Sequence, residues 1–414
     1  MPKESFITGL DIGSANIRVA VAQVQPNSPT LHIVGAAEHE AHGISKGSVT
    51  SIEDAVSVIS QTLEIVERMT GIPTHHAFVG IGGTHITSLE SHGVVAVSRA
   101  DGEIKEDDIE RVVEAAQTVA TPPNYQILHV IPRTFAVDNQ RGIKDSVGMT
   151  GMRLEVDTQI IQGLAGQIKA IEKTVFRTGL SIDDIVLGAM AAAESALSKR
   201  QKELGVALVN IGGATTSVVV FEEGDVLHVK VLPVGAGHIT NDIAIGLRTS
   251  IDLAEQIKIH AGTALADAVG KREEVNLAEF EGGDQTVVSR KQIADIVEAR
   301  LEEIFKIVDK ELQSIDRSGM LPAGVVLTGG GAHLQGILDV AKRVFRLPAS
   351  IGVPQNIVTA IDKVNNPSFT TALGLAAWGA SVEDRSGIFG KVPDLSSVRA
   401  VTDRIKGVFR NFIR

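Results

Sequence analysis

The sequence predicts an α/β fold made of two related halves, and three observations indicate it. Short β-rich runs alternate with helical runs along the chain, as in α/β proteins. One pattern, an apolar strand followed by a small-residue loop and a second strand, occurs at residues 10–21 and again at 209–220. The chain has 414 residues, too many for one ordinary core, so at least two domains are expected.

Composition excludes several classes of protein. Hydrophobic residues make up 43% and charged residues 21%, the balance of a soluble globular chain. No apolar run approaches about 18 residues and the N-terminus leads into a strand pattern, so neither a spanning helix nor a signal peptide is expected. The absence of cysteine removes disulfides, thiolate zinc sites and cysteine nucleophiles, and fits a reducing cytoplasm. A net charge of −11 makes nucleic acid an unfavourable partner.

The opening block predicts a strand–turn–strand unit followed by a helix and a strand. Strands at 6–12 and 17–24 are joined by a tight turn at 13–16. Apolar residues recur at near-helical spacing over 52–69, which predicts a helix, and a strand is predicted at 76–82.

The next block has a different rhythm and indicates a small inserted subdomain at residues 84–163. Its predicted elements are a strand near 85–98, a helix at 106–119, and strands at 125–137 and 152–163. After it, we predict a helix at 166–178, a strand at 183–187, a helix at 189–200 and the second hairpin at 206–222.

The remaining chain predicts a second insertion-like block and a detached tail. A helix at 250–261, a hairpin near 274–288 and a long helix at 290–314 form the block. A strand at 324–328 leads through a glycine loop into a helix, and the last core helix is predicted at 368–380. Glycine, proline and serine in 381–398 are typical of a flexible linker before an amphipathic segment at 399–414.

The repeated hairpin carries the main functional signal. When 10–21 is aligned with 209–220, Ile, Gly, Ala, Val and Val coincide without gaps, and Asp11 falls on Asn210. One such loop alone is adequately explained as a β-turn. Two matching loops about 200 residues apart indicate a duplicated fold.

The two loops have the chemistry of a phosphate clamp. Small residues allow backbone N–H groups to approach an anion closely, and nearby hydroxyls can donate further hydrogen bonds. Asp11, at a strand end, could hold a hydrated Mg²⁺. No GxxxxGK[ST] motif occurs, so the loop is not a Walker A loop. The predicted phosphate-binding residues are Asp11, Gly13, Ser14, Asn16, Asn210, Gly212, Gly213, Thr215 and Thr216.

A third loop, Gly329-Gly330-Gly331, follows an apolar strand and is predicted to open a helix. The N-terminus of a helix favours phosphate because its free N–H groups and dipole attract negative charge. On this motif alone, a tight strand-to-helix turn is an equally good interpretation.

These three segments resemble the phosphate 1, phosphate 2 and adenosine motifs of the actin/Hsp70/sugar-kinase superfamily. Within it the chain resembles the bacterial cell-division family FtsA, on Leu-His-Val-Ile-Pro at 128–132, Gly-Ile-Lys-Asp-Ser-Val-Gly-Met at 142–149 and Thr-Asn-Asp-Ile-Ala at 240–244. The resemblance covers residues 5–380 and the tail. It implies an actin-like fold, with ATP and Mg²⁺ in a cleft between two RNase H-like halves.

The resemblance also implies a division into subdomains and further site residues. Gly235 belongs to a loop of the nucleotide site, and Glu255 and Lys258 would contact the ribose or adenine side. On spacing alone, Glu255 and Lys258 are one helical turn apart and could be a surface ion pair. The implied subdomains are 1–83 with 164–205 (1A), 84–163 (1C), 206–247 with 315–380 (2A) and 248–314 (2B).

Three departures from the superfamily pattern bear on catalysis. Asn210 replaces the usual Asp, and a neutral amide cannot attract Mg²⁺ or orient water as a carboxylate does. Gly188 lies where actins and Hsp70s place a catalytic Gln or Glu. Ala236 lies where a second glycine is common. We therefore expect nucleotide binding with slow or negligible hydrolysis.

The C-terminal segment predicts an in-plane membrane helix. Placed on a helix, its apolar residues fall within an arc of roughly 140°, and its basic residues lie outside that arc. The residues predicted to contact the membrane are Val401, Arg404, Ile405, Lys406, Val408, Phe409, Arg410, Phe412 and Ile413. A helix docked on the protein's own core, or in a partner's groove, is the alternative.

By resemblance, the chain is expected to be an adaptor at the division site, on the cytoplasmic face of the cell membrane. Its partners would be the anionic inner membrane surface, a second copy in a head-to-tail filament, the C-terminal peptide of FtsZ and later division proteins. Arg300 and Glu303 are the candidate contacts for the FtsZ peptide, although an ordinary charged helix face explains them equally well. The alternatives are a PilM-like adaptor of pilus assembly and a small-molecule kinase.

Overall fold

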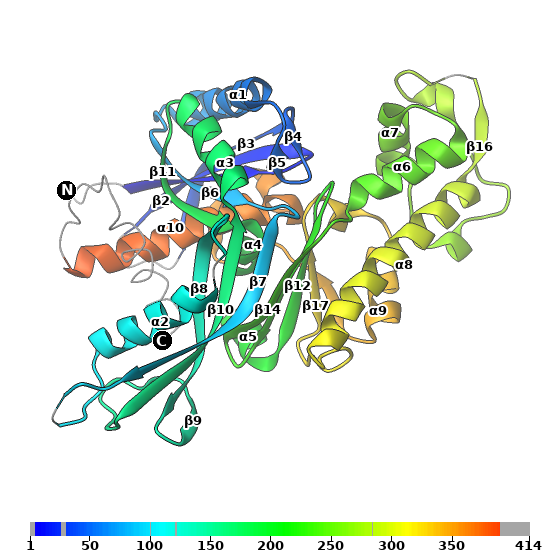
Figure 1. Ribbon diagram of the computed structural model, residues 1–414. Coiled ribbons are helices and arrows are strands. Elements are labelled where there is room, and N and C mark those ends of the chain that lie inside the picture. Colours follow the sequence, from blue (N-terminus) through cyan, green and yellow to red (C-terminus); the bar gives the residue numbers. More distant parts are fainter. Residues whose placement is uncertain (1–4, 26–29, 100, 121, 284, 390–414) are drawn as a thin grey trace.

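The computed structural model describes residues 5–25, 30–99, 101–120, 122–283 and 285–389. Two sheets lie at the centre of two halves, and a third, smaller sheet projects from them (Figure 1). In the described ranges no helix is long and apolar enough to cross a bilayer. The predicted membrane segment at 399–414 lies outside them.

The first sheet has six strands in the order β11-β6-β1-β2-β3-β19. β1, β2 and β3 form an antiparallel meander, whereas β6 and β11 run parallel to β1. The carboxyl ends of β1, β6 and β11 therefore lie at one edge. The strands are β1 (Ser5–Ile12), β2 (Asn16–Val24), β3 (Leu31–Glu40), β6 (His76–Ile81), β11 (Ser181–Leu187) and β19 (Ile357–Thr359).

Helices α1 (Ile52–Thr70) and α3 (Ala165–Arg177) pack on this first half, which confirms both predicted helices (Figure 1). The Ser51 side chain caps α1 by accepting a hydrogen bond from the Asp54 N–H. Gly71 ends α1 with φ 69°, a conformation that costs glycine little. A small hairpin of β4 (Ile44–Ser45) and β5 (Ser48–Val49) precedes α1.

The second sheet is buried on both faces. In β12, Val206 and Leu208 belong to the core cluster shared with the first half, whereas Ala207 and Val209 face the other cluster, as strand alternation requires. The sheet order is β14-β13-β12-β17-β18. The strands are β12 (Val206–Ile211), β13 (Thr216–Glu222), β14 (Asp225–Leu232), β17 (Val325–Thr328) and β18 (Ala349–Ile351).

Four helices complete the second half. α6 packs against α7 and α8, and α9 packs against α8 and β18 (Figure 1). The hairpin predicted near 274–288 is present as β15 (Glu274–Asn276) paired with β16 (Val287–Ser289). The helices are α6 (Ala236–Leu247), α7 (Ile251–Ala261), α8 (Arg290–Ser314) and α9 (Ile337–Phe345).

The inserted block at 84–163 forms a body with its own core, as predicted. Its sheet has the order β7-β10-β8-β9, and α2 (Glu106–Ala120) packs on β7 and β10. Its core cluster is separate from the other two large clusters. The strands are β7 (Ile86–Ala96), β8 (Tyr125–Val137), β9 (Gln140–Ile143) and β10 (Arg153–Leu164).

Two helices lie between the two main sheets. α10 (Thr370–Phe389) packs on β1, β2 and β6, and α4 (Gly188–Ala196) packs on α10 and on β12 and β13. Their approach is very close, because a Cβ added at Gly374 of α10 would lie 1.8 Å from the Ala191 carbonyl oxygen of α4. Glycine at this position sets the spacing of the two halves.

Three predicted boundaries were wrong. The helix predicted at 189–200 ends at Ala196, and Ser198 begins α5 (Lys199–Leu204) with a capping box to Gln201. The glycine loop opens only a 3₁₀ turn, η3 (Gly330–His333), because glycine is a poor helix former. The linker predicted from 381 does not begin there, since α10 continues to Phe389, and the rest of the predicted linker lies outside the described residues.

The α4–α10 contact generates a stability prediction. We expect Gly374→Ala to lower the free energy of unfolding by at least about 2 kcal/mol, because its methyl group would overlap the Ala191 carbonyl. Urea unfolding followed by circular dichroism measures the change. Gly166→Ala is the matched control: no atom lies within 4 Å of its added Cβ, so it should gain about 0.5 kcal/mol. Equal stability of the two variants would contradict the prediction.

Candidate functional site

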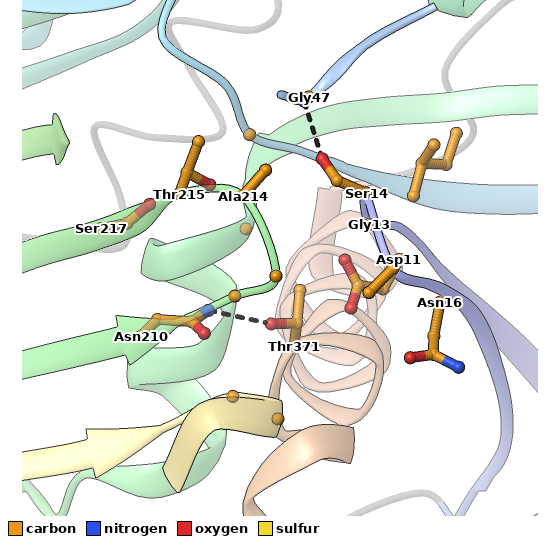
Figure 2. A pocket seen from close by; sticks show the side chains of 18 of the residues that line it. Asp11, Gly13, Ser14, Asn16, Gly47, Asn210, Ala214, Thr215, Ser217 and Thr371 are labelled. Carbon is orange, nitrogen blue, oxygen red and sulfur yellow. Dashed lines mark hydrogen bonds between the residues drawn. The ribbon is translucent and has the colours of Figure 1, made fainter. Parts of the chain in front are cut away.

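A pocket opens between the halves, where the carboxyl ends of strands from both sheets converge (Figure 2). This is the edge at which ligands bind in open α/β sheets. The first half contributes Asp11, Ile12, Gly13, Ser14, Ala15, Asn16, Arg18, Gly47, Ile81 and Gly82. The α4 and α10 region contributes Gly188, Ala189, Ser368 and Thr371, and the second half contributes Asn210, Gly212, Gly213, Ala214, Thr215, Ser217, Gly329 and Gly330.

The two hairpin loops are built alike, as the sequence repeat predicts. The Gly13 N–H donates to the Asn16 carbonyl at 3.2 Å, and the Gly212 N–H donates to the Thr215 carbonyl at 2.9 Å. The loops also meet across the cleft, because a Cβ added at Gly213 would lie 2.9 Å from the Ala15 Cβ. Small residues on both sides therefore leave backbone N–H groups accessible to an anion.

Ten of the predicted phosphate or nucleotide residues line the pocket: Asp11, Gly13, Ser14, Asn16, Asn210, Gly212, Gly213, Thr215, Gly329 and Gly330. Thr216 does not, because it is the first residue of β13 and alternation turns its fully buried side chain into the core. Gly331 does not either, since its Cα faces Ile211, whose side chain an added Cβ would meet at 2.4 Å.

Gly235 packs against the backbone of the second hairpin loop. It precedes α6, and a Cβ there would lie 2.5 Å from the Gly212 carbonyl. The next two N–H groups, of Ala236 and Gly237, donate to the Gly212 and Gly213 carbonyls at 2.9 and 2.7 Å. These bonds fix the carbonyls of the second loop away from the pocket, which leaves its N–H groups for an anion.

Glu255 and Lys258 lie on α7, outside the pocket lining. The Lys258 ammonium donates to Glu255 at 2.6 Å and to the Thr240 hydroxyl of α6 at 2.9 Å. The Lys258 side chain is 12% exposed, so this pair joins two helices rather than lying freely on the surface. Their contact with a nucleotide stays a prediction.

Arg300 is already engaged. Its guanidinium binds the Asp242 carboxylate through two hydrogen bonds, of 2.5 and 2.9 Å, and binds Glu303 through a third of 2.7 Å. The hydrogen bond to Asp242 raises the pKa of Arg300. The bidentate pair ties α8 to α6, a role that sequence reasoning missed because Asp242 is 58 residues away.

Asp11 is the charged group on which the pocket chemistry depends. Enclosure by the surrounding protein raises the pKa of Asp11 to about 6, and the nearby Arg18 guanidinium lowers it in part. Arg18 is paired to Asp11 in the β1–β2 register, and it binds Glu38 at 3.1 Å. The carboxylate is therefore short of compensating positive charge.

Two polar contacts at the pocket were not foreseen. The Ser14 hydroxyl accepts a hydrogen bond from the Gly47 N–H at 2.8 Å, so its own proton can point elsewhere. The Asn210 amide donates to the Thr371 hydroxyl at 3.3 Å (Figure 2). No periodic pattern marks Gly47 or Thr371, which the fold brings from 33 and 161 residues away.

The residues present fit a hydrated magnesium ion bound with a phosphate. Mg²⁺ usually takes one or two carboxylates and fills its other positions with waters and phosphate oxygens. The pocket offers one carboxylate, Asp11, beside two loops of small and hydroxyl-bearing residues. Among the residues described here, no three His, Asp or Glu side chains form a ready-made metal cluster.

Two protein-family models and a curated relative match the sequence of this chain. Residues 207–374 match the family model described as cell division protein FtsA. Residues 83–162, the projecting sheet and its helix, match the model of the SHS2 domain inserted in FtsA. A curated relative, the cell division protein FtsA of Pseudomonas aeruginosa, is 40% identical over 374 residues, which cover 90% of this chain and 89% of the relative.

Solved structures show the same fold at much lower identity. The PilM-PilN type IV pilus biogenesis complex is 15% identical with a TM-score of 0.66, over 90% of this chain and 98% of that one. MreB5 of Spiroplasma citri bound to ADP is 14% identical with a TM-score of 0.53, over 93% of this chain and 99% of that one. The actin-like fold predicted from the three motifs is thereby confirmed.

The raised pKa of Asp11 predicts a pH dependence of stability. An acid whose pKa rises on folding favours the folded state below its unfolded pKa, near 3.8, and this stability is lost as the pH rises through about 6. Between pH 4 and pH 7, we expect the free energy of unfolding of Asp11→Asn to rise by about 1–2 kcal/mol relative to that of the wild type. This is less than the full pKa shift would give, because water enters the pocket.

Urea unfolding of both proteins at the two pH values, without nucleotide, measures this difference. Asp183→Asn is the comparison variant, near the amino end of β11. Burial also raises the pKa of Asp183, but His76, which binds it at 3.1 Å, lowers it, so a smaller pH-dependent change in stability is expected. A stability difference between wild type and Asp11→Asn that does not change with pH would refute the interpretation.

Proposed function

The chain belongs to the FtsA family of cell division proteins, and on that premise we propose that it is an actin-like, ATP-binding adaptor of the division machinery. It binds ATP and Mg²⁺ between its two halves and associates head to tail on the cytoplasmic face of the membrane. There it tethers FtsZ filaments and recruits later division proteins. The observation that carries the nucleotide part is the pocket enclosed by two matching hairpin loops.

The nucleotide would lie with its phosphates between the two loops. The N–H groups around Gly13 and Gly213 and the hydroxyls of Ser14 and Thr215 are the donors available to the phosphate oxygens. Asp11 would hold the magnesium ion through water. When bound, the ion neutralises phosphate charge and would relieve the unfavourable charge of Asp11. Glu255 and Lys258 remain the proposed contacts on the base side.

Hydrolysis is expected to be slow. Asp11 is the one carboxylate in the pocket lining, and Asn210, at the matching position of the second loop, is an amide bound to Thr371. Gly188 and Ala189, at the start of α4, bring no side chain that could orient water. ATP would then act chiefly as a conformational ligand that favours the closed, self-associating form.

The tail supplies the membrane part of the proposal. Its six apolar residues and its basic residues segregate, and the segment carries five basic and one acidic side chain on a chain of net charge −11. A single short helix of this kind binds anionic lipid weakly and reversibly. Polymerisation would place many tails on one filament, and their combined attachment would bind the filament to the membrane much more strongly than one tail does.

The alternative functions have less support. A PilM-like adaptor shares the fold, but the similarity in sequence to that pilus complex is 15%, against 40% to a curated FtsA. A small-molecule kinase would need a base to activate an acceptor hydroxyl, and Asp11 is already committed to the metal in this scheme. The pilus adaptor stays the second candidate, and binding to a pilus peptide would identify it.

The membrane proposal predicts the outcome of co-sedimentation with anionic liposomes. We expect the full chain to pellet with vesicles, more so with ATP and Mg²⁺, whereas a truncation after Val398 stays in the supernatant. Asp11→Asn should lose the ATP-dependent increase and keep the basal binding. Neutral vesicles are the lipid control. Equal sedimentation of the full chain and the truncation would exclude the tail as the anchor.

The FtsZ proposal predicts that substitutions of the two partners of one ion pair affect peptide binding differently. If the Arg300 guanidinium contacts an acidic FtsZ peptide, Arg300→Glu should weaken binding at least about tenfold. Asp242→Asn releases Arg300 from its bidentate pair and should preserve or strengthen binding.

Fluorescence anisotropy of a labelled C-terminal FtsZ peptide measures both affinities, with thermal unfolding as a check on folding. Glu302→Gln, which only breaks an exposed helix pair with Lys306, is the matched control. Weakened binding in both Arg300→Glu and Asp242→Asn would assign the pair a purely structural role.

A further inference from the structure

The inserted subdomain, residues 84–163, touches both halves of the molecule. It is carried by the first half: β8 packs on β11, and the His129 ring accepts a hydrogen bond from the Leu187 N–H at 2.9 Å. The same ring packs edge-on against Trp378 of α10 at 5.6 Å. Any contact between this subdomain and the second half is therefore a contact across the pocket-bearing cleft.

Such contacts are present along β14, the edge strand of the second sheet. β14 lies beside β7 and also meets β8 and β10 (Figure 1). The Ser88 hydroxyl of β7 donates to the Val229 carbonyl of β14 at 2.5 Å. This bond joins the main chain of β14, the edge strand of the second sheet, to the inserted sheet.

An ion pair strengthens the contact at the other end of β14. Lys144, which follows β9, donates to the Asp225 carboxylate and lies 3.5 Å from Glu223. The Asp225 side chain is only 15% exposed, whereas that of Glu223 is 75% exposed. Burial raises the pKa of Asp225 and Lys144 lowers it, so Lys144 supplies the charge that a half-enclosed carboxylate needs. Lys144 belongs to the 142–149 motif, for which the adaptor scheme has no role.

Both sides of this contact lead directly into the walls of the pocket. β7 begins at Ile86, four residues after Gly82, which lines the pocket from the first half. β13 begins next to Thr215, which lines it from the second half, and it pairs along its length with β14. A change in the separation of the two walls must therefore move β7 relative to β14.

We propose that Ser88, Lys144, Glu223, Asp225 and Val229 form a cleft clasp, through which closure of the nucleotide pocket fixes the inserted subdomain against the second half. The inference rests on the proposed binding of ATP in that pocket. A nucleotide held by both hairpin loops keeps the walls together and the clasp engaged. Loss of the nucleotide lets the halves separate, and the inserted subdomain leaves β14 with the first half. By linkage, the clasp in turn tightens nucleotide binding.

The test uses the full chain with two spin labels. The sequence has no cysteine, so Met152→Cys in the inserted subdomain and Met320→Cys in the second half, both more than half exposed, are the sole labelling sites. Double electron–electron resonance gives the distribution of distances between the two labels with and without ATP and Mg²⁺, and calorimetry gives the ATP affinity.

The variants are Lys144→Gln, Lys144→Glu, Asp225→Lys and the swap Lys144→Glu with Asp225→Lys. Lys169→Glu, an exposed charge reversal on α3, is the control.

We expect ATP to narrow the distance distribution of the wild type and of Lys169→Glu. Each single clasp variant should broaden it and weaken ATP binding about three- to tenfold, and the swap should recover most of both. Lys144→Gln removes the cation without adding a negative charge, so it tests the pair even if the reversals fold poorly. Wild-type distances and affinity in Lys144→Gln and Lys144→Glu would overturn the clasp while the nucleotide site stands. A wild-type chain that binds no ATP would overturn the nucleotide site, and the clasp with it.

Discussion

The close packing of α4 against α10 is the constraint on which the rest of the structure depends. Gly374 allows the α10 backbone to lie against the Ala191 carbonyl, and the two helices fill the space between the sheets. The same helices begin at the pocket, where Gly188 and Thr371 line it. The contact that joins the halves therefore also sets the width of the site, since the pocket walls cannot move apart without shifting this pair.

The pocket combines this rigid frame with an unfavourable charge. Asp11 has a pKa of about 6 because its surroundings desolvate it, and Arg18 compensates only in part, being shared with Glu38. A group that costs stability in the empty protein is typical of a binding site rather than of a core. In the proposed function a cation bound with a polyphosphate would supply the missing compensation, which would link ligand binding to the stability of the closed form through one carboxylate.

Electrostatics also organises the periphery of the molecule. Arg300 and Asp242 tie α8 to α6, Lys258 and Glu255 tie α7 to α6, and Lys144 and Asp225 tie the inserted sheet to β14. The first two pairs join helices that share one core cluster, whereas Lys144 and Asp225 join the inserted sheet to the second half. Such pairs fix the positions of neighbouring elements but still allow them to separate, because part-exposed ion pairs contribute little free energy. In the nucleotide-responsive adaptor that we propose, ion pairs of modest strength would allow the packed elements to move relative to one another.

Much of the local structure and the class of site could be predicted from the amino-acid sequence alone. Periodicity placed many elements within two or three residues, although β3, β14 and α6 were not predicted. The repeat of Asp11-Ile-Gly with Asn210-Ile-Gly located both walls of the pocket, because strand-end loops of small residues have a local signature. Features that depend on contacts between distant segments became visible only in the folded chain. Folding turned Thr216 and Gly331 away from the pocket, brought in Gly47 and Thr371, paired Arg300 with Asp242 and set Lys144 against Asp225. Which face a side chain takes at a strand end, and which charge it meets, follows from packing between elements, and no local pattern records it.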